Sequence, residues 1–408
     1  MLKLQTIISK IRNHFYYLSI TSIGMSMSLV ITIIVTRNLS IIDRSDYGIA
    51  TVALMQILMI AQLGLPGAFG ITGLSPFRKF SFRKFLKLYL LRTFWFLLAI
   101  LIFTALLQGN FIVTLYAFLN GLLLIPSQWV MNALQKTIPR NKFFLLRLTP
   151  TCVQFILVFS LFILKLENLQ NFLLVWIIGN LVYLLACLKI IKKEMTNYFI
   201  DDSTKDLSEI VKMGYAGFIP HISIQEILRI DILLLPLLKD PTFTASYFVI
   251  VGVATWPKAI CDAIAVANFP TIMSLKEPIP RSRFLQRITM QIRVVLLASF
   301  LVNFFIMLGL RKIYPSEYTT TIWAIIPLTI SSVMSSSRRL YLDLLRSRSK
   351  EYAMHATKIE LISFLPTLAS YFLLFSKLNL LEWTNCLVLA AYLGLAMTKN
   401  KVKFYEKF

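Results

Sequence analysis

Five ionisable side chains lie inside two consecutive apolar segments in the second half of the chain. Glu226, Arg229 and Asp231 lie in the first segment, and Lys258 and Asp262 lie in the next. Because Lys258 and Asp262 are four residues apart, they share one face of a helix. An ionisable group in lipid costs at least about 2.5–3.5 kcal/mol at a helix centre. We therefore expect these five side chains to face a polar cavity or to pair with one another.

Two interpretations of this charged group stay open. In the first, Arg229 and Lys258 bind an anionic group, because guanidinium and ammonium groups both suit phosphate. Glu226 and Asp262 then balance the charge or couple transport to protons or Na⁺. In the second interpretation, Lys258–Asp262 and Glu226–Arg229 are internal ion pairs that hold two helices together. Asp231 lies near the outer end of its segment, where we expect it to order the turn.

Three further residues within apolar segments invite a functional interpretation. Pro66 and Pro257 would kink transmembrane helices and free a backbone carbonyl. Such kinks serve either as hinges for alternating access or as simple packing kinks. Arg92 lies near the inner end of its segment, and we expect its long side chain to extend to the membrane interface.

The composition explains why these charges must lie in a membrane. Of 408 residues, 57% are hydrophobic and 15% are charged, whereas a soluble globular chain is about 45–50% apolar and about 25% charged. The apolar residues form continuous runs, which favour membrane helices over the alternating strands of a barrel. We predict an all-α polytopic membrane protein with about 12 transmembrane helices in two six-helix lobes around a central cleft. The runs span residues 15–36, 49–71, 88–107, 111–132, 148–164, 171–188, 210–237, 243–269, 290–309, 319–337, 359–376 and 380–397.

The distribution of basic residues predicts the orientation. With the N-terminus inside, 32 of the 42 Lys and Arg residues fall in inner segments, 7 in outer segments and 3 within spans. This asymmetry follows the positive-inside rule and predicts an even number of spans with both termini cytoplasmic. The net charge of +23 is therefore interpreted as topology, and no nucleic-acid partner is expected.

The longest inner connection divides the chain into two halves. We predict an N-terminal lobe at 1–195, a charged cytoplasmic linker at 196–208 and a C-terminal lobe at 209–408. The halves are weakly similar, because Pro126 and Pro327 lie 201 positions apart and the second and eighth spans both open with a tyrosine. Two parallel lobes of six helices around a cleft are typical of a transporter.

The turn after the first span carries a family signature. In TRNLSIIDRSDYGIA, the residues Arg37, Leu39, Tyr47 and Gly48 resemble the R-x-L…Y-G pattern of polysaccharide flippases in the multidrug/oligosaccharidyl-lipid/polysaccharide exporter superfamily. Further similarities extend over the later spans, with departures at two positions where the family shows glycine. The further matches are Asp231, Tyr247, Pro270, Glu317 and Tyr318, and the departures are Phe248 and Ser316.

The chain thus resembles a Wzx-type flippase. The resemblance implies translocation of undecaprenyl-pyrophosphate-linked oligosaccharide repeat units (O-antigen, capsule or exopolysaccharide) from the cytoplasmic to the periplasmic leaflet of the bacterial inner membrane. It implies lipid-linked oligosaccharide and membrane lipids as partners, with a polysaccharide polymerase and a chain-length regulator beside them. We expect no enzymatic activity, cofactor or metal site, apart from coupling to H⁺ or Na⁺. By position, Arg12, Arg147 and Arg293 at the inner ends of spans are candidates for first contact with pyrophosphate.

Other functions stay open as alternatives. A membrane polysaccharide polymerase or glycosyltransferase would need catalytic groups in a sizeable outer loop, but the outer acids here lie in short turns. A cation-coupled multidrug exporter of the same superfamily typically carries an acid in the first span, and Phe15 to Val35 contains none. A peptidoglycan-precursor flippase is usually longer and carries an arginine in that span, and both features are missing here.

Overall fold

The structure is a computed structural model. It describes residues 2–62, 64–72, 82–107, 111–135, 137–197, 208–212, 241–254, 257, 281–313, 322–346, 350–373 and 378–405. All regular structure in these ranges is helical, and no strand occurs in them. Five of the described helices are long and apolar enough to cross a membrane: α6, α7, α8, α14 and α17. The prediction of an all-α, multi-span membrane protein is confirmed.

The chain divides into two compact units, Met1–Ile222 and Ser223–Phe408. The predicted linker at 196–208 lies almost entirely outside the described residues. The first unit contains α1 (Leu2–Asn38), α2 (Ile41–Gln62), α3 (Leu65–Thr72), α5 (Phe82–Leu107), α6 (Phe111–Leu134), α7 (Arg140–Leu164) and α8 (Leu169–Asn197). The second contains α12 (Pro241–Ala254), α14 (Arg281–Ile313), the short 3-10 helix η2 (Ile322–Ala324), α15 (Ile325–Arg346), α16 (Lys350–Phe372) and α17 (Leu380–Tyr405).

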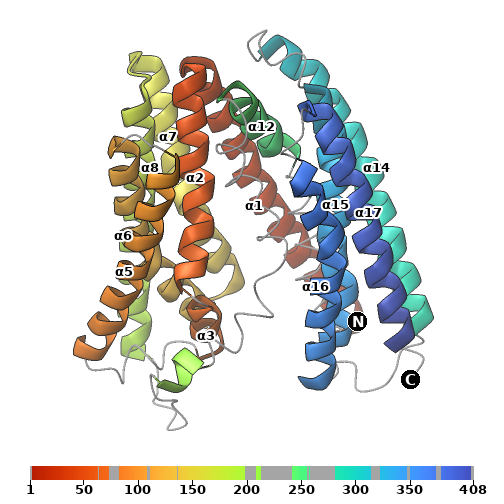
Figure 1. The fold of residues 1–408 in the computed structure, drawn as a ribbon. Helices are drawn as coiled ribbons and strands as arrows, with labels where there is room; N and C mark the ends of the chain where they lie inside the picture. Colours follow the sequence, from red (N-terminus) through yellow and green to blue (C-terminus); the bar gives the residue numbers. More distant parts are fainter. Residues whose placement is uncertain are drawn as a thin grey trace. The chain divides into compact units, whose positions relative to one another are not determined.

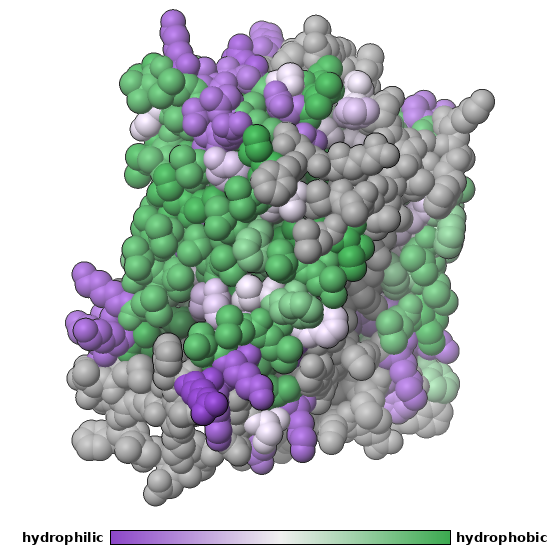
Figure 2. Space-filling model, turned by 60° about the vertical axis from the view of Figure 1, so that its left-hand side comes forward, coloured by the Kyte–Doolittle hydropathy of each residue, from purple (hydrophilic) through white to green (hydrophobic). Residues whose placement is uncertain are grey.

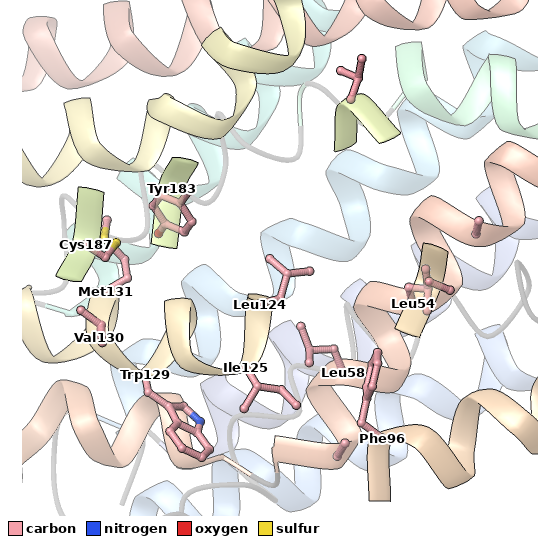
Figure 3. Close-up of a cluster of buried hydrophobic side chains, with 14 of the residues drawn as sticks. Leu54, Leu58, Phe96, Leu124, Ile125, Trp129, Val130, Met131, Tyr183 and Cys187 are labelled. Atoms are coloured by element: carbon pink, nitrogen blue, oxygen red, sulfur yellow. The ribbon is translucent and has the colours of Figure 1, made fainter. Parts of the chain in front are cut away.

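Helix α6 is central to the first unit. It packs against α8, α2, α3 and α5, while α7 packs against α8 and α1 (Figure 1). Figure 3 shows how side chains from α2, α5, α6 and α8 meet in the core, with Leu58, Phe96, Ile125 and Trp129 all fully buried. The Trp129 ring also lies against Phe69 of α3, with ring centroids 5.6 Å apart. The short α3 is therefore held onto α6 by an aromatic contact.

The second unit repeats this packing scheme with later helices. α15 packs most extensively against α17, just as α6 packs most extensively against α8 in the first unit. The pairs α16–α17 and α14–α15 correspond in the same way to α7–α8 and α5–α6. Three helix pairings of the first unit thus have counterparts in the second, as expected of a duplicated unit, whereas the contact between α15 and α16 has no counterpart between α6 and α7.

The polarity of α14 is inverted relative to a helix on a soluble protein. Its exposed stripe is apolar, whereas its buried face carries Ser299 and Asn303, both 0% exposed. The Asn303 Nδ2 donates a hydrogen bond to the Thr329 hydroxyl of α15. Lipid favours this inversion, because apolar side chains face hydrocarbon and polar ones join helices inside. The exposed stripe comprises Met290, Val294, Leu297, Leu301, Phe305 and Leu308.

The first unit shows the same distribution on its surface. Figure 2 shows a broad hydrophobic band on the face turned toward the viewer, with hydrophilic side chains gathered near its two ends. Helix α7 of the first unit exposes large apolar side chains, among them Ile156 at 61% and Ile163 at 64%. A hydrophobic band with polar ends matches the hydrocarbon core and the two interfaces of a bilayer.

The structure corrects two expected element boundaries. The apolar run at 49–71 is broken, because α2 ends at Gln62 and α3 begins at Leu65 with Gly64 between them at φ 75°. Glycine adopts this left-handed conformation without the steric cost that other residues incur. Pro66 therefore lies in the first turn of α3, where proline is tolerated because no helical hydrogen bond is lost. The break is made by the glycine, and the proline follows it.

The second correction concerns the segment 338–358, which the charge distribution assigned to an inner connection. Instead, α15 continues to Arg346 and α16 begins at Lys350. Hydrophobicity ends before the helix does, because the terminal turns of a membrane helix carry polar residues outside the hydrocarbon. The same extension appears at the start of α7 and at the end of α8.

Candidate functional site

The charged group predicted in the seventh and eighth spans lies outside the described residues. Glu226, Arg229, Asp231, Lys258 and Asp262 therefore stay predictions. Pro257, which precedes Lys258 in the sequence, is helical and buried. Arg12 belongs to α1, and its side chain is not among those described.

Two of the predicted entrance cations are described, and both are exposed. Arg147 lies on α7 and interacts electrostatically with Tyr183, a buried tyrosine of α8. Arg293 lies on α14 and interacts in the same way with Tyr341, a buried tyrosine of α15. Each arginine thus keeps its charge accessible while a phenol from a neighbouring helix lies near it. The two belong to different units.

The signature turn between α1 and α2 is ordered by a reciprocal cap. The Asp43 amide donates to the Ser40 hydroxyl at 3.1 Å, and that hydroxyl donates to the Asp43 carboxylate at 2.8 Å. The buried Arg44 donates from NH2 to the Leu39 carbonyl at 2.6 Å. These bonds give hydrogen-bond partners to the Asp43 amide in the first turn of α2 and to the Leu39 carbonyl just after α1, groups that helix ends leave unpaired. Two signature residues therefore have a structural explanation, since Leu39 is buried in the core and Tyr47 packs edge-on against Phe172.

Arg92 is buried, which corrects the expectation that it would extend to the interface. Its side chain is 2% exposed, and its NH1 donates to the Ala61 carbonyl at 3.3 Å. Ala61 lies in the last turn of α2, where carbonyls lack partners within the helix and carry the negative end of its dipole. The break after Gln62 therefore creates the acceptor that a buried arginine satisfies.

Gln62 is a second polar side chain at this break. It is 1% exposed, and within the described part of the chain neither atom of its carboxamide has a hydrogen-bond partner. A buried amide without partners costs free energy. The α2–α3 break thus combines a left-handed glycine, a buried cation and an unsatisfied amide.

The first unit also contains a buried amide pair. Asn180 of α8 donates from Nδ2 to the Asn120 oxygen of α6 at 2.7 Å, and both side chains are buried. Asn120 in turn donates to the Tyr116 carbonyl at 3.0 Å. In lipid, packing apolar side chains between helices has no hydrophobic driving force. Interhelical hydrogen bonds of this kind therefore help to hold membrane helices together.

The second unit buries an arginine and a glutamate where three helices meet. Arg338 of α15 and Glu360 of α16 are 2% and 6% exposed, and they interact electrostatically. NH1 of Arg338 donates to the Ser363 carbonyl of α16 at 2.8 Å, and its Nε donates to the Ser335 carbonyl at 3.4 Å. One guanidinium therefore connects α15 to α16.

Sequence reasoning missed this pair for identifiable reasons. Arg338 stands beside Arg339 at the end of an apolar run, so it was counted with the inner basic residues. The signal that would have revealed the site lies on α16. Glu360, Ser363 and Thr367 recur at spacings of three and four, which places them on one helix face within an apolar segment.

Comparison with solved structures finds membrane transporters. An inward-facing multidrug resistance MATE family transporter of the MOP superfamily aligns with a TM-score of 0.62 and 11% identity over 97% of this chain and 99% of that chain. The MATE multidrug transporter DinF-BH gives 0.60 and 14% over 98% and 95%. The lipid II flippase MurJ in an inward closed conformation gives 0.59 and 15% over 95% and 87%.

The chain has the fold of these transporters. No protein-family profile matches the sequence, and no curated protein matches it either. At identities of 11–15% the likeness establishes the fold alone. The transporter fold spans drug exporters and a lipid flippase, so the substrate has to be argued from the residues of this chain.

Proposed function

We propose that the protein is a flippase that moves undecaprenyl-pyrophosphate-linked oligosaccharide repeat units across the bacterial inner membrane by alternating access. The observation that carries the proposal is the signature turn on this fold. Arg37, Leu39, Tyr47 and Gly48 match the polysaccharide flippases of the superfamily. Leu39 lies in a capped turn between the first two helices of a transporter fold, Arg37 lies in the last turn of α1, and Tyr47 and Gly48 lie near the start of α2.

The chemistry of α1 supports a neutral, hydroxyl-rich substrate. Ser22, Ser26 and Ser28 are exposed in a segment that carries no charged side chain from Phe15 to Val35. The hydroxyls of Ser26 and Ser28 donate to carbonyls of their own helix at 2.9 and 3.0 Å. Each oxygen keeps lone pairs that accept hydrogen bonds from sugar hydroxyls. An exporter of cationic drugs would instead be served by a carboxylate, and the first span has none.

The pyrophosphate makes a second demand, because its charges must be matched by cations. The exposed Arg147 and Arg293 offer fork-shaped donors for phosphate oxygens at the predicted cytoplasmic ends of α7 and α14. Arg229 and Lys258 would then receive the headgroup within the membrane, and Glu226 and Asp262 would balance the charge. Arg12 completes the set of predicted contacts.

A deletion strain of the source organism tests the proposal. Membranes are extracted, and lipid-linked oligosaccharide and surface polysaccharide are quantified in strains complemented with the wild type, Arg229→Ala, Lys258→Ala or the control Arg83→Ala. Arg83 is an exposed basic residue at the start of α5 that topology alone accounts for. We expect loss of surface glycan with repeat units retained on the cytoplasmic side, rescue by the wild type and Arg83→Ala, and failure of the other two variants.

Two outcomes would contradict the proposal and favour an alternative. Accumulation of flipped but unpolymerised units would indicate a polymerase. Unchanged glycan pools together with increased drug sensitivity would indicate a multidrug exporter, a function that the MATE transporters of the same fold represent. Immunoblots of membrane fractions must show equal amounts of each variant.

A further inference from the structure

The interior of the second unit contains a titratable group that the proposed function has not used. Glu360 is the one acidic side chain that is buried among the described residues. It lies on α16, at the second position of the apolar run 359–376 that the sequence assigns to the membrane. A carboxylate buried inside the protein is costly unless it is paired, and its retention there points to a functional role.

Three helices converge on the partner of this carboxylate. Arg338 reaches from α15 to the Ser363 carbonyl of α16, while Gly394 of α17 packs against both groups. A Cβ on Gly394 would lie 2.5 Å from the Ser363 oxygen and 3.0 Å from the Arg338 NH1. The guanidinium is therefore clamped between helices, and any change in its pairing with Glu360 acts on α15, α16 and α17 together.

A row of polar side chains leads along α16 from Glu360. Ser363, Thr367 and Ser370 follow at helical spacing, and all are buried. In the described part of the chain, the Thr367 hydroxyl oxygen has no hydrogen-bond partner. From Glu360 to Ser370 the row rises about 15 Å, at about 1.5 Å per residue, which is half of the roughly 30 Å of hydrocarbon. The Ser363 hydroxyl donates to the Glu360 backbone carbonyl at 3.0 Å, and the Ser370 hydroxyl donates to the Thr367 backbone carbonyl at 2.7 Å. Each hydroxyl oxygen keeps lone pairs that can accept further hydrogen bonds, so the row gives this face of α16 a polar lining.

We propose that Glu360 is a proton-binding site that couples transport to a proton gradient, with Arg338 as the cation that competes with the proton for its carboxylate. This inference rests on the proposed function for what is coupled. Glu360 belongs to a different segment of the sequence from the acids suggested for coupling by the sequence analysis, Glu226 and Asp262.

The charge balance of the cycle is simple. A proton from one aqueous side binds a carboxylate oxygen of Glu360 and gives a neutral acid. Arg338 then keeps its carbonyl acceptors but loses its counter-charge, so the junction of α15, α16 and α17 rearranges. When the proton leaves to the other side, the carboxylate regains its charge and pairs with Arg338 again. One proton crosses, and no other species is consumed.

Among the described side chains of α15, α16 and α17, few ionisable groups other than Glu360 are buried. From α15, the buried ionisable side chains are Arg338 and Tyr341, and the Tyr341 hydroxyl is hydrogen-bonded with Thr289 of α14 at 2.9 Å. On α16 itself, Tyr371 is buried and interacts with Arg338, and His355 is partly exposed. α17 contributes no buried ionisable side chain among its described residues, and its Lys399 is partly exposed. Among these described groups, Arg338 is the buried cation that interacts with Glu360.

Infrared difference spectroscopy tests proton binding without any substrate. Spectra of the purified full-length protein are recorded in acidic and in neutral buffer, and the band of a protonated carboxyl group in a dry environment is followed. We expect this band in the wild type and in Glu382→Gln, and its loss in Glu360→Gln. Glu382 is the matched control, because it is an exposed acid that caps the start of α17. An unchanged band in Glu360→Gln would overturn the proposal.

Transport in proteoliposomes tests the coupling. With undecaprenyl-pyrophosphate-linked N-acetylglucosamine as the probe, a gradient of about one pH unit should shift the ratio of flipped to unflipped lipid about tenfold if one proton is coupled. Glu360→Gln should remove this shift and keep flipping down the gradient of the probe. A full shift in Glu360→Gln would overturn the coupling role. If no condition moves the probe but the infrared band behaves as expected, the proposed function fails and the proton site stands.

Glu360→Gln leaves Arg338 without its counter-charge, so a folding defect has to be separated from a coupling defect. The double variant Glu360→Gln with Arg338→Gln removes both charges and leaves a neutral pair, a replacement that buried ion pairs tolerate well. We expect it to be monodisperse and to lack the infrared band and the gradient response. Retention of either signal in the double variant would contradict the assignment.

Discussion

At the scale of single residues, the buried arginines in the described part of the chain donate to backbone carbonyls. Arg92 donates to Ala61 at the end of α2, Arg44 to Leu39, and Arg338 to Ser335 and Ser363. A backbone carbonyl has two lone pairs, of which a helical hydrogen bond uses one, and a guanidinium brings five donors in a fixed geometry. Each arginine therefore satisfies backbone groups that lipid could not.

Replacing Arg92 with methionine should loosen the last turn of α2. The variant keeps an apolar stem of similar length but leaves the Ala61 carbonyl without this donor, at a local cost of about 1–3 kcal/mol. Hydrogen exchange followed by mass spectrometry should show faster exchange at the end of α2, by roughly 5- to 150-fold. Arg83→Met, at an exposed position of the same helix, is the control. Equal exchange in both variants would show that Arg92 does not hold the turn.

At the scale of elements, close helix packing depends on a few small residues. Gly121 of α6 faces Phe96 of α5, and a Cβ on Gly121 would come within 1.7 Å of the ring. Because Phe96 is fully buried among the side chains shown in Figure 3, the ring has no free volume into which to move. The contact between α5 and α6 therefore requires glycine at this position.

Gly121→Ala should destabilise the first unit by about 1–3 kcal/mol through overpacking. Gly309→Ala on α14 is the matched control, since nothing lies within 4 Å of its Cβ position. That change should be neutral or stabilising by up to about 1 kcal/mol, because alanine favours helix. Thermal unfolding of the detergent-solubilised variants measures both effects. A smaller loss for Gly121→Ala than for Gly309→Ala would refute the packing argument.

The apolar runs of the sequence predict the helices well, because a bilayer forces any long apolar run to form one. They cannot predict where a helix ends, since the polar turns of α15 and α16 beyond the hydrocarbon look like a loop in composition. They also cannot predict which charge is buried. Arg92 and Arg338 are paired through carbonyls of other helices, and those contacts arise only when the chain is folded.

The same distinction, between what the sequence predicts and what arises only on folding, applies to the candidate site residues. Exposed cations such as Arg147 and Arg293 could be identified from position, because topology places basic residues at one end of each span. The Glu360–Arg338 pair could not, because its two residues are brought together only by the packing of α15 on α16. The five residues of the predicted charged group, Glu226, Arg229, Asp231, Lys258 and Asp262, stay predictions.

At the scale of the whole molecule, the orientation in the membrane is the first matter to measure. With Cys152, Cys187, Cys261 and Cys386 replaced by serine, single cysteines are introduced at Leu166 and at Lys142, which are exposed near opposite ends of α7. A membrane-impermeant maleimide applied to intact spheroplasts should label Leu166→Cys and leave Lys142→Cys unlabelled until the cells are opened. The reverse pattern would place the N-terminus outside and contradict the charge asymmetry.

The central claim is that the protein moves a pyrophosphate-linked sugar lipid from one leaflet to the other. Purified protein is reconstituted into liposomes that contain undecaprenyl-pyrophosphate-linked N-acetylglucosamine, and the lipid exposed on the outer leaflet is followed with an impermeant galactosyltransferase. We predict that wild-type protein exposes the inner pool much faster than protein-free liposomes, and that Lys258→Ala does so more slowly while Arg83→Ala matches the wild type. Equal rates with and without protein, under every imposed gradient, would contradict the flippase account.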